Sequence, residues 1–390
     1  MSADLHMKPG IFCFITPFAS PASCKHAEKL IDCLAPIAGR LFVVGDQRID
    51  LNHQPSHVIR SVSIPTLHYL STQKPLFYSA ILWIVKLIWI MTQASWALFG
   101  NRHKIQIVIC FLGQYYTPIL IMGRLLGKKN IVFEPASDFV INKKVYKTRK
   151  GWIFLDYILR SLIHINRTVT HIIVVESIQV VNQGRLKSFL QKLRKANLYV
   201  NTDLFKELVP LQKRERIAGF MGRLSDEKGI LSFLETAKIM RNSGVRFRIV
   251  GDGPLRKEVE KVLEHKEMSH VEFSGWLSNN GVIDFLNDIR LMLLPSTGEG
   301  VPNAILEAMA CGTPVLATAV GGIPDLITHN ETGFILPDTK ASTIANLVIE
   351  ALKNPDLPAI SRRGQIYIEN KFSLDASISR WCRVINELAA

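Results

Sequence analysis

The alternation of short apolar runs with longer segments of helical period is the feature that most constrains the fold of this chain. Runs rich in Val, Ile and Phe occupy residues 11–18, 41–44, 105–112, 130–133 and 171–175 of the first half, and residues 217–221, 246–250, 271–273, 291–294, 314–317 and 334–336 of the second. Strands that alternate with helices form parallel sheets whose two faces are covered by helices. The pattern therefore predicts an α/β protein.

The pattern restarts after residues 197–205, which predicts two doubly wound Rossmann-like domains facing each other across a cleft. A chain of 390 residues accommodates two such domains, since a domain contains about 100 to 200 residues. We assign residues 1–205 to the first domain and residues 206–373 to the second. Ligands of open α/β sheets bind at the carboxyl ends of the strands, so the residues that directly follow each strand are the candidates for function.

The positive charge of the chain is confined to its first half. Residues 1–200 contain 25 Lys and Arg against 9 Asp and Glu; the totals are 47 and 33, so 22 and 24 remain for residues 201–390. A basic half attracts polyanions such as nucleic acid, anionic lipid headgroups or a phosphorylated acceptor. The six cysteines include no C-x-x-C pair, which argues against a disulfide framework or a zinc site and indicates a reducing, cytosolic compartment.

Residues 76–99 form an apolar stretch with a single charge. Such a stretch is long enough to span a bilayer, but it can also lie on a membrane surface or be buried in a soluble domain. Spanning is disfavoured, because it would place the strands predicted at 11–18 and 41–44 across the bilayer from the strand predicted at 105–112. These strands are expected to share one sheet.

The tryptophans of this stretch, Trp83, Trp89 and Trp96, together with Lys86, favour a helix lying on an anionic membrane surface. The buried helix remains the alternative. The start of the chain, with Lys8 before an apolar run, faintly resembles a signal peptide, but the first strand of an α/β domain is the preferred interpretation.

In the second half, residues 222–229 follow a predicted strand and open a helix. Gly222 permits a sharp turn. Arg223 and Lys228 place two cations beside a helix N-terminus, whose dipole and free N–H groups also favour anions. This segment outlines a pocket for a diphosphate, although two surface cations near a helix start would give the same pattern.

Two further strand ends carry glycines. The segment Gly251-Asp252-Gly253-Pro254 follows the next strand, and Gly275-Trp276-Leu277 follows the one after it. At the second of these places a nucleotide base could lie against backbone and an apolar side chain. Either segment could equally be only a turn.

The richest segment is residues 295–315, in which a strand leads into a Gly-rich loop and then a helix that Pro302 starts and Gly312 ends. Glu299 lies on the loop and Glu307 inside the helix. A carboxylate on the loop can accept hydrogen bonds from sugar hydroxyls, and one on the helix can accept them from ribose hydroxyls, in both cases without a metal. The glycines Gly321 and Gly322 mark a fourth strand end of the same kind.

Together these segments resemble the retaining glycosyltransferases of family 4, which have the GT-B fold. The resemblance covers residues 200–372 well and the first 200 residues only in strand order. It implies that Arg223 and Lys228 hold the nucleotide diphosphate, that Glu299 and its loop hold the donor sugar, and that Glu307 holds the ribose. It also implies that the terminal helix, residues 374–390, packs back on the first domain.

The implied activity is transfer of a sugar from a nucleoside diphosphate sugar, with UDP or GDP, to an acceptor hydroxyl with retained configuration. Glu299, Arg223 and Lys228 are the expected catalytic residues, with Glu299 positioning the donor rather than acting as a nucleophile. The expected donor-binding residues also include Gly222, Gly251, Gly253, Trp276, Leu277, Gly300, Val301, Pro302, Asn303 and Glu307. Because the sequence contains no Asp-x-Asp, we expect neither a metal nor a cofactor.

The first half departs from the family pattern, because no Gly pair follows its first strand. Ser20, Ser23, Glu134 and Asp138 are the weak candidates on the acceptor side, where a polar side chain could orient a hydroxyl. His26 is expected to be structural.

The apolar stretch and the basic half favour a lipid-linked or membrane-proximal glycan acceptor, as in cell-envelope polysaccharide assembly. The expected location is cytoplasmic, with the protein peripheral on the cytoplasmic face of the inner membrane.

Other functions stay open at this point. A sugar-nucleotide epimerase or a phosphorylase would share the GT-B fold, and fold does not decide function. The basic half could instead make this a nucleic-acid-binding protein, but the sequence carries no helix-turn-helix, zinc or RNP signature, so nucleic acid is not an expected partner.

Overall fold

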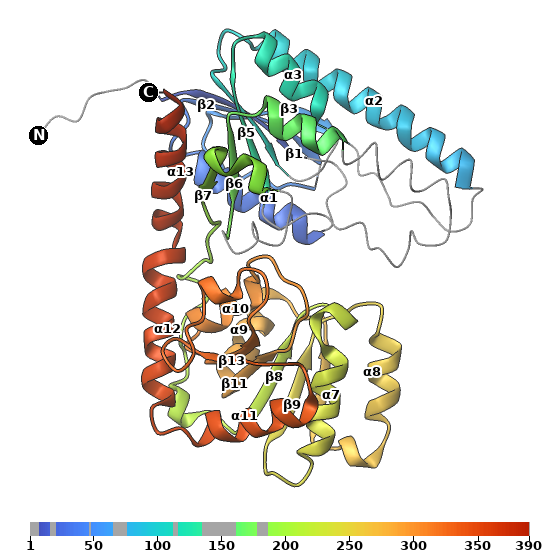
Figure 1. Cartoon of the computed structure of the whole chain (residues 1–390), viewed down its shortest axis with the longest axis vertical. Helices are drawn as coiled ribbons and strands as arrows, with labels where there is room; N and C mark the ends of the chain where they lie inside the picture. The colour runs from blue at the N-terminus through green and yellow to red at the C-terminus, as the bar shows by residue number, and fades with distance from the viewer. Residues whose placement is uncertain are drawn as a thin grey trace, which may run out of the picture. The chain divides into compact units, whose positions relative to one another are not determined.

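The computed structural model describes residues 8–15, 21–46, 48–64, 76–111, 116–134, 161–177 and 186–389. The chain divides into two compact units. Unit 1 comprises Met1–Glu176, Gly184–Leu198 and Ser377–Ala390, and unit 2 comprises Ser177–Gln183 and Tyr199–Ala376. Each unit is a parallel sheet with helices along it (Figure 1).

Unit 1 contains a seven-stranded sheet in the order β3-β2-β1-β4-β5-β6-β7, and all neighbouring strands are parallel. The strands are β1 (Gly10–Ile15), β2 (Arg40–Asp46), β3 (Val58–Ile64), β4 (Ile107–Phe111), β5 (Lys129–Glu134), β6 (Ile172–Val175) and β7 (Leu193–Lys195). The described helices are α1 (Pro21–Leu34), α2 (Leu76–Gly100), α3 (Thr117–Leu125), residues 161–169, η1 (Lys187–Lys192) and α13 (Leu374–Ala389). The order reverses between β1 and β4, as in a doubly wound fold.

Helices on both faces explain why the central strands of unit 1 are apolar throughout. Every residue of β1 is buried, and its alternate side chains face opposite sides of the sheet. Phe12 and Phe14 pack in one cluster with α2 and α3. A second group of rings contains Phe133 of β5, which stacks on Phe111 with ring centroids 5.1 Å apart. Phe133 also makes an edge-to-face contact with Trp381 of α13, again with centroids 5.1 Å apart.

The apolar runs of the sequence did not predict β3 and β7. These strands are the two edges of the sheet. β3 reads VIRSVSI and β7 reads LRK, so polar and charged side chains interrupt both. An edge strand is less buried than a central one and has less need of a continuous apolar run.

Unit 2 contains a six-stranded parallel sheet in the order β10-β9-β8-β11-β12-β13. Its strands are β8 (Ile217–Met221), β9 (Arg246–Val250), β10 (Val271–Gly275), β11 (Leu291–Leu294), β12 (Val315–Thr318) and β13 (Phe334–Leu336). Its helices are η2 (Leu211–Lys213), η3 (Asp226–Lys228), α7 (Ile230–Ile239), α8 (Arg256–Leu263), η4 (Lys266–Met268), α9 (Asn279–Asp288), α10 (Asn303–Ala310), η5 (Ile323–Asp325), α11 (Ala341–Lys353) and α12 (Leu357–Phe372). This strand order is doubly wound, like that of unit 1.

One continuous apolar core supports the sheet of unit 2. Phe220 of β8, Phe233 of α7 and Phe247 of β9 contact one another in sequence, with ring centroids 5.5 Å apart at each step. These large rings fasten α7 to the strands and so hold the loops at the strand ends in place. In the described part of the chain, no helix combines the length and the apolar character needed to cross a membrane.

Candidate functional site

The strand order of unit 2 reverses between β8 and β11, which are neighbours in the sheet although β9 and β10 separate them in the chain. Residues 222–229 connect β8 to α7, and residues 295–302 connect β11 to α10. Open α/β sheets bind their ligands at the carboxyl ends of such a strand pair. Both helices also direct the free N–H groups of their first turns to this edge.

The loops after β8 and β11 are packed against each other through Gly229. Its φ of 75° lies in the left-handed region, and a side chain at this position would collide with the carbonyl oxygen of Pro295. Close by, the amide of Thr297 donates to the carbonyl oxygen of Glu227 over 2.8 Å. The two loops therefore form one continuous rim at the end of the sheet.

The loop after β12 supports the same rim from its other side. Gly321 has a φ of 57° and leaves no room for a side chain beside the carbonyl oxygen of Glu299. The amide of Gly322 donates to the carbonyl oxygen of Gly300 over 2.7 Å. These backbone contacts hold the backbone of Glu299 in place without the help of a ligand.

The carboxylate of Glu299 is almost fully buried and has two partners. Its side chain is 3% exposed, and Lys228 Nζ donates to Oε2 over 2.5 Å. Ser296 Oγ donates to Oε1 over 2.7 Å. A buried carboxylate requires such compensation. The Lys228 side chain remains 26% exposed, so its ammonium group still has access to solvent or to a ligand.

Three hydroxyl residues at this rim were not predicted from the sequence. Ser296 is fully buried and holds Glu299, and Thr318 Oγ1 donates to the carbonyl oxygen of Ser296. Ser225 Oγ is buried and makes no hydrogen bond within the described residues. No signal in a single sequence separates such hydroxyls from ordinary loop serines, because their importance comes from the carboxylate beside them.

The loop after β9 supports the segment that carries Arg223. The amide of Gly222 donates to the carbonyl oxygen of Val250 over 3.0 Å, and the amide of Leu224 donates to that of Asp252 over 3.0 Å. Arg223 lies between these anchored residues with an exposed side chain. Its backbone is thus held by two hydrogen bonds while its guanidinium is available to a ligand.

The remaining glycine turns have structural roles. Gly251 packs against the carbonyl of Gly222, and Gly253 packs against the backbone of Leu224. The side chain of Asp252 belongs to an exposed ion pair with Arg256, with Nη1 and Oδ2 3.3 Å apart.

The other predicted donor residues are divided between two places. Val301 and Pro302 are buried, Asn303 is the first residue of α10, and Glu307 is half-buried one turn further along that helix. Trp276 is 73% exposed and follows β10, the edge strand two positions from β8. The structure thus brings Lys228 and Glu299 into contact, and it places Trp276 and Leu277 beyond an intervening strand.

The four acceptor-side candidates lie in unit 1, and the structure describes the side chain of one of them, Glu134. Ser20 and Asp138 lie outside the described residues, and Ser23 lies in α1 with its side chain outside them. Glu134, at the end of β5, accepts two hydrogen bonds from the buried Arg167, over 3.2 and 2.8 Å. Burial raises the pKa of Tyr116, and the negative charge of Glu134 adds to this rise.

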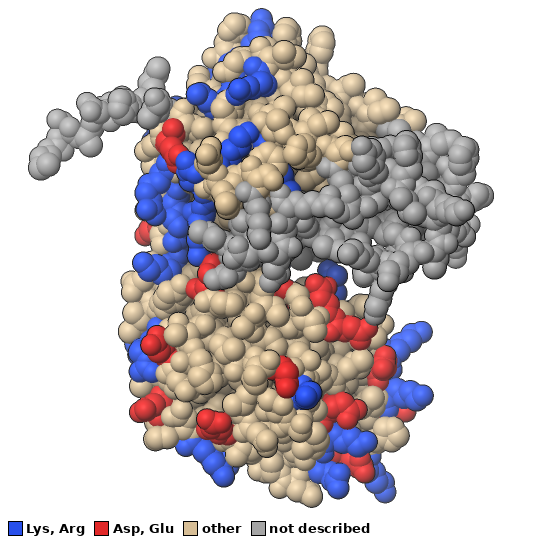
Figure 2. All heavy atoms as spheres, viewed as in Figure 1, with Lys and Arg blue, Asp and Glu red and all other residues tan. Residues whose placement is uncertain are grey.

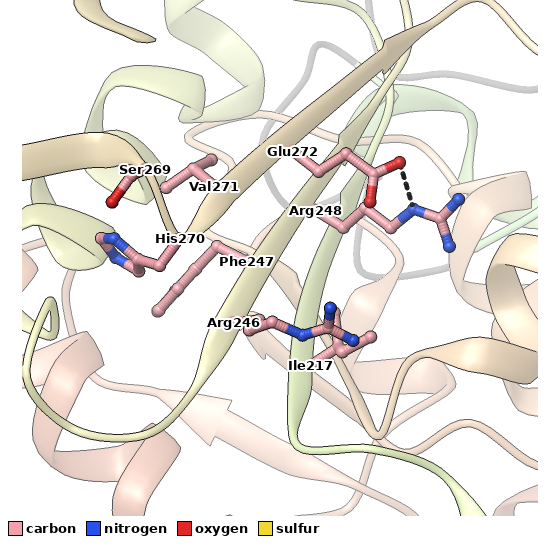
Figure 3. A pocket seen from close by; sticks show the side chains of 8 residues that line it. All are labelled: Ile217, Arg246, Phe247, Arg248, Ser269, His270, Val271 and Glu272. Carbon is pink, nitrogen blue, oxygen red and sulfur yellow. Dashed lines mark hydrogen bonds and ion pairs between the residues drawn. The ribbon is translucent and has the colours of Figure 1, made fainter. Parts of the chain in front are cut away.

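A separate hollow of about 320 Å³ opens at the amino ends of β8, β9 and β10 (Figure 3). Both arginines that line it form ion pairs with acidic side chains. Arg246 pairs with Glu215, and Arg248 pairs with Glu272 and Asp288 over 3.2 and 2.9 Å. This hollow lies at the amino ends of the strands. Glu299 lies at their carboxyl ends, where ligands of such sheets usually bind.

Within the ranges that the structure describes, no group of three or more His, Cys, Asp or Glu side chains has the geometry to hold a metal ion.

Comparison with known proteins finds a family match for part of the chain. Residues 201–365 match the family described as glycosyl transferases group 1. WcaL of Escherichia coli (strain K12), named for colanic acid biosynthesis, is 31% identical over 164 residues, which cover 39% of this chain and 40% of WcaL. The amylovoran biosynthesis glycosyltransferase AmsK of Erwinia amylovora is 25% identical over 179 residues, which cover 43% of this chain and 44% of AmsK. The matched part of the chain thus spans less than half of either relative.

The whole fold has a counterpart among solved structures. Anabaena Alr3699/HepE, solved in complex with UDP and glucose, superposes with a TM-score of 0.69 over 97% of this chain and 99% of its own, at 16% identity. At this identity the likeness shows the fold alone. Two Rossmann-like units in one chain are the architecture called GT-B, as predicted. Residues 201–365, less than half of the chain, therefore match the family described as glycosyl transferases group 1.

Proposed function

We propose that this protein is a retaining glycosyltransferase that moves a sugar from a nucleoside diphosphate sugar to an acceptor hydroxyl. The observation that carries the proposal is the contact between Lys228 and the buried Glu299 at the point where the strand order reverses. An exposed arginine, Arg223, lies on the same loop as Lys228. Cationic side chains can bind a diphosphate, and a carboxylate can accept hydrogen bonds from sugar hydroxyls.

In the proposed reaction, the bond between the anomeric carbon and the diphosphate oxygen breaks and its electron pair passes to the diphosphate. The acceptor oxygen forms the new bond to that carbon on the same face, and its proton passes to a phosphate oxygen. Arg223, Lys228 and the N–H groups at the start of α7 stabilise the charge that develops on the diphosphate. These groups supply positive charge where other enzymes use a divalent metal, so we propose that transfer is metal-independent.

We assign Glu299 a positioning role toward the donor sugar. Both of its carboxylate oxygens already accept a hydrogen bond, from Lys228 and from Ser296. Such bonds stabilise the carboxylate and make it a poorer nucleophile. They leave lone pairs that can accept hydrogen bonds from sugar hydroxyls. Glu307 is proposed to accept hydrogen bonds from the ribose.

The acceptor is proposed to be a lipid-linked or membrane-proximal glycan in polysaccharide biosynthesis, with the protein on the cytoplasmic face of the inner membrane. The names of WcaL and AmsK support the polysaccharide assignment. The UDP found with HepE makes UDP-sugars the first donors to test, followed by GDP-sugars.

The test is release of nucleoside diphosphate from a panel of UDP- and GDP-sugars, with and without a membrane lipid extract as acceptor. The proposal expects release that requires the acceptor, persists in EDTA and is lost in Glu299→Gln. The matched control is Glu272→Gln, which removes an arginine-paired carboxylate at the opposite edge of the sheet.

The other functions give different results in the same assay. Conversion of the donor without an acceptor indicates an epimerase, and release of sugar phosphate in the presence of phosphate indicates a phosphorylase. Salt-sensitive retention on nucleic acid without any turnover would contradict the proposal and favour a nucleic-acid-binding protein.

A further inference from the structure

Helix α2 of unit 1 has two apolar faces, of which only one is buried. Ile90, Met91, Ala94 and Leu98 pack into the core cluster that contains Phe12 and Phe14. A helix at the surface of a soluble domain normally presents polar residues on its other side.

The other side of α2 is exposed and mostly apolar, with Thr92 and Gln93 as its exposed polar residues. Its exposed large side chains are Val85, Ile88, Trp89, Trp96 and Phe99, with Trp89 47% and Trp96 77% exposed. Successive members are three, one, seven and three residues apart, a spacing that keeps all five on one side of the helix. At 1.5 Å per residue the stripe is about 21 Å long. We call these five residues the α2 stripe.

Basic residues follow α2 and the helix that packs beside it. Directly after the helix, Arg102 sits over the ring of Phe99 with its guanidinium carbon 4.4 Å from the ring centroid, and Lys104 follows with an exposed side chain. Helix α3 packs beside α2, and Lys128 and Lys129 follow α3. Residues 51–133 contain no Asp or Glu.

The charge of the surrounding surface agrees with this sequence pattern. On the face that Figure 2 shows, the described part of unit 1 carries Lys and Arg side chains with few acidic residues among them, whereas both signs are mixed on unit 2. A row of apolar side chains that includes two tryptophans, flanked by cations and free of acids, matches the interfacial layer of an anionic bilayer. A protein partner would not need this uniform sign along the whole face.

We propose that the α2 stripe docks unit 1 on an anionic lipid bilayer, with α2 lying in the plane of the interface. The side chains of the stripe insert among the acyl chains just below the headgroups, while Arg102, Lys104, Lys128 and Lys129 contact the lipid phosphates. The proposal concerns unit 1 and goes beyond the transfer reaction. It fixes the surface by which the protein would meet a lipid-linked acceptor.

The test is flotation of the full chain with vesicles of phosphatidylcholine alone and with added phosphatidylglycerol. The wild type is expected to float with the anionic vesicles and to be released by high salt. The double variant Trp89→Ser/Trp96→Ser is expected to lose about tenfold or more in partitioning, because interfacial binding scales with buried apolar area. Trp276→Ser, which removes an equally exposed tryptophan of unit 2, is the matched control and is expected to float like the wild type.

Lipids with brominated acyl chains locate the contact. They are expected to quench tryptophan fluorescence in the wild type and in Trp276→Ser, and to quench far less in the double variant. Because Trp89 and Trp96 are exposed, the double variant is expected to keep the wild-type unfolding midpoint.

Three outcomes would overturn the proposal. The first is unchanged flotation of the double variant, and the second is no flotation of the wild type. The third is a wild-type dimer in solution that the double variant dissociates, which would show that a second copy covers the stripe. UDP and GDP binding by the wild type and the double variant, measured without vesicles, keeps this test separate from the proposed transferase activity: lost flotation with intact nucleotide binding concerns only the α2 stripe.

Discussion

Glu299 and Lys228 depend on each other, because the carboxylate is buried and the ammonium is its only charged partner within hydrogen-bonding distance among the described residues. Removing Lys228 alone should cost more than removing both residues, since the Glu299 carboxylate then stays buried without its cation, whereas the partly exposed Lys228 can be solvated when Glu299 is removed. The same two residues are proposed to act on the donor. Stability and activity can therefore be separated by substituting them singly and together.

We predict that Glu299→Gln lowers turnover about 100-fold, the loss expected for one strong transition-state contact, and hardly changes the unfolding midpoint. Lys228→Met is predicted to lower turnover as well and to cost about 2 kcal/mol of unfolding free energy, because it leaves the Glu299 carboxylate without its cation. The double variant is expected to regain most of that stability and none of the activity.

Turnover assays and urea unfolding of the three variants measure this cycle. Lys238→Met, which removes an exposed lysine paired with Glu267, serves as the control. A Lys228→Met protein as stable as Glu299→Gln would show that the two side chains are not coupled.

At the scale of elements, the sequence predicted the central strands and the loops that follow them. These strands are apolar on both faces, and the loops carry the glycines that close packing requires at Gly229 and Gly321. It did not predict the edge strands β3 and β7, whose polar residues break the apolar pattern. Nor did it predict Ser296, because a buried serine is recognised only by the carboxylate that it contacts.

Arg214 joins several elements of unit 2, and its burial makes the junction sensitive to change. Its side chain is fully buried, and the guanidinium donates to the carbonyl oxygens of Val209, Leu286 and Cys311 over 2.8, 2.9 and 2.7 Å. The segment before β8 is thereby tied to the ends of α9 and α10. A buried arginine with this many partners cannot be replaced by an apolar side chain without leaving carbonyl groups unpaired.

We predict that Arg214→Met lowers the unfolding free energy by about 3 kcal/mol, as measured by urea unfolding. Arg246→Met, which removes an exposed ion pair with Glu215, is expected to cost less than about 1 kcal/mol. Similar costs for the two variants would contradict the structural role of Arg214.

Glu176, which directly follows β6, links stability to pH. Burial raises its pKa from 4.5 to about 8. The folded protein therefore holds a proton on this group over a pH range in which the unfolded chain has released it. The unfolding free energy is then expected to fall as the pH rises from about 5 to about 8, at most by about 1.4 kcal/mol per pH unit.

We predict that Glu176→Gln removes this contribution, so that the variant gains stability relative to the wild type as the pH increases across that range. Urea unfolding at several pH values measures it, with the exposed Glu264→Gln as control. Parallel pH profiles of the wild type and Glu176→Gln would show that Glu176 releases its proton equally easily in both states.

At the scale of the whole molecule, the chain begins in unit 1, forms unit 2 and returns to unit 1 with the last part of α13. The fully buried Trp381 is the largest side chain that this return adds, and it meets Phe133 edge to face. Arg194, on β7, pairs with Glu387 of the same helix. Unit 1 is thus completed by residues that are among the last of the sequence.

We predict that Trp381→Ala lowers the stability of unit 1 by about 3 to 5 kcal/mol, the usual cost of emptying a buried tryptophan site. Nucleotide binding by unit 2 is expected to survive at low temperature. Thermal unfolding followed by circular dichroism measures the first effect, and Trp96→Ala, at an exposed position, is the control. A Trp381→Ala protein with the wild-type midpoint would show that α13 contributes little to the core of unit 1.

The central claim is that the carboxyl edge of the unit 2 sheet binds the diphosphate of the donor. It is tested most directly by calorimetric titration of UDP and GDP into the wild type, Arg223→Ala and Arg248→Ala. We predict that the wild type binds UDP or GDP. Arg223→Ala is expected to weaken this binding about tenfold or more, as the loss of a charge-assisted contact would. Arg248→Ala is expected to bind like the wild type. The claim would be contradicted if Arg248→Ala abolished binding while Arg223→Ala left it intact, because the nucleotide would then occupy the hollow at the opposite edge of the sheet.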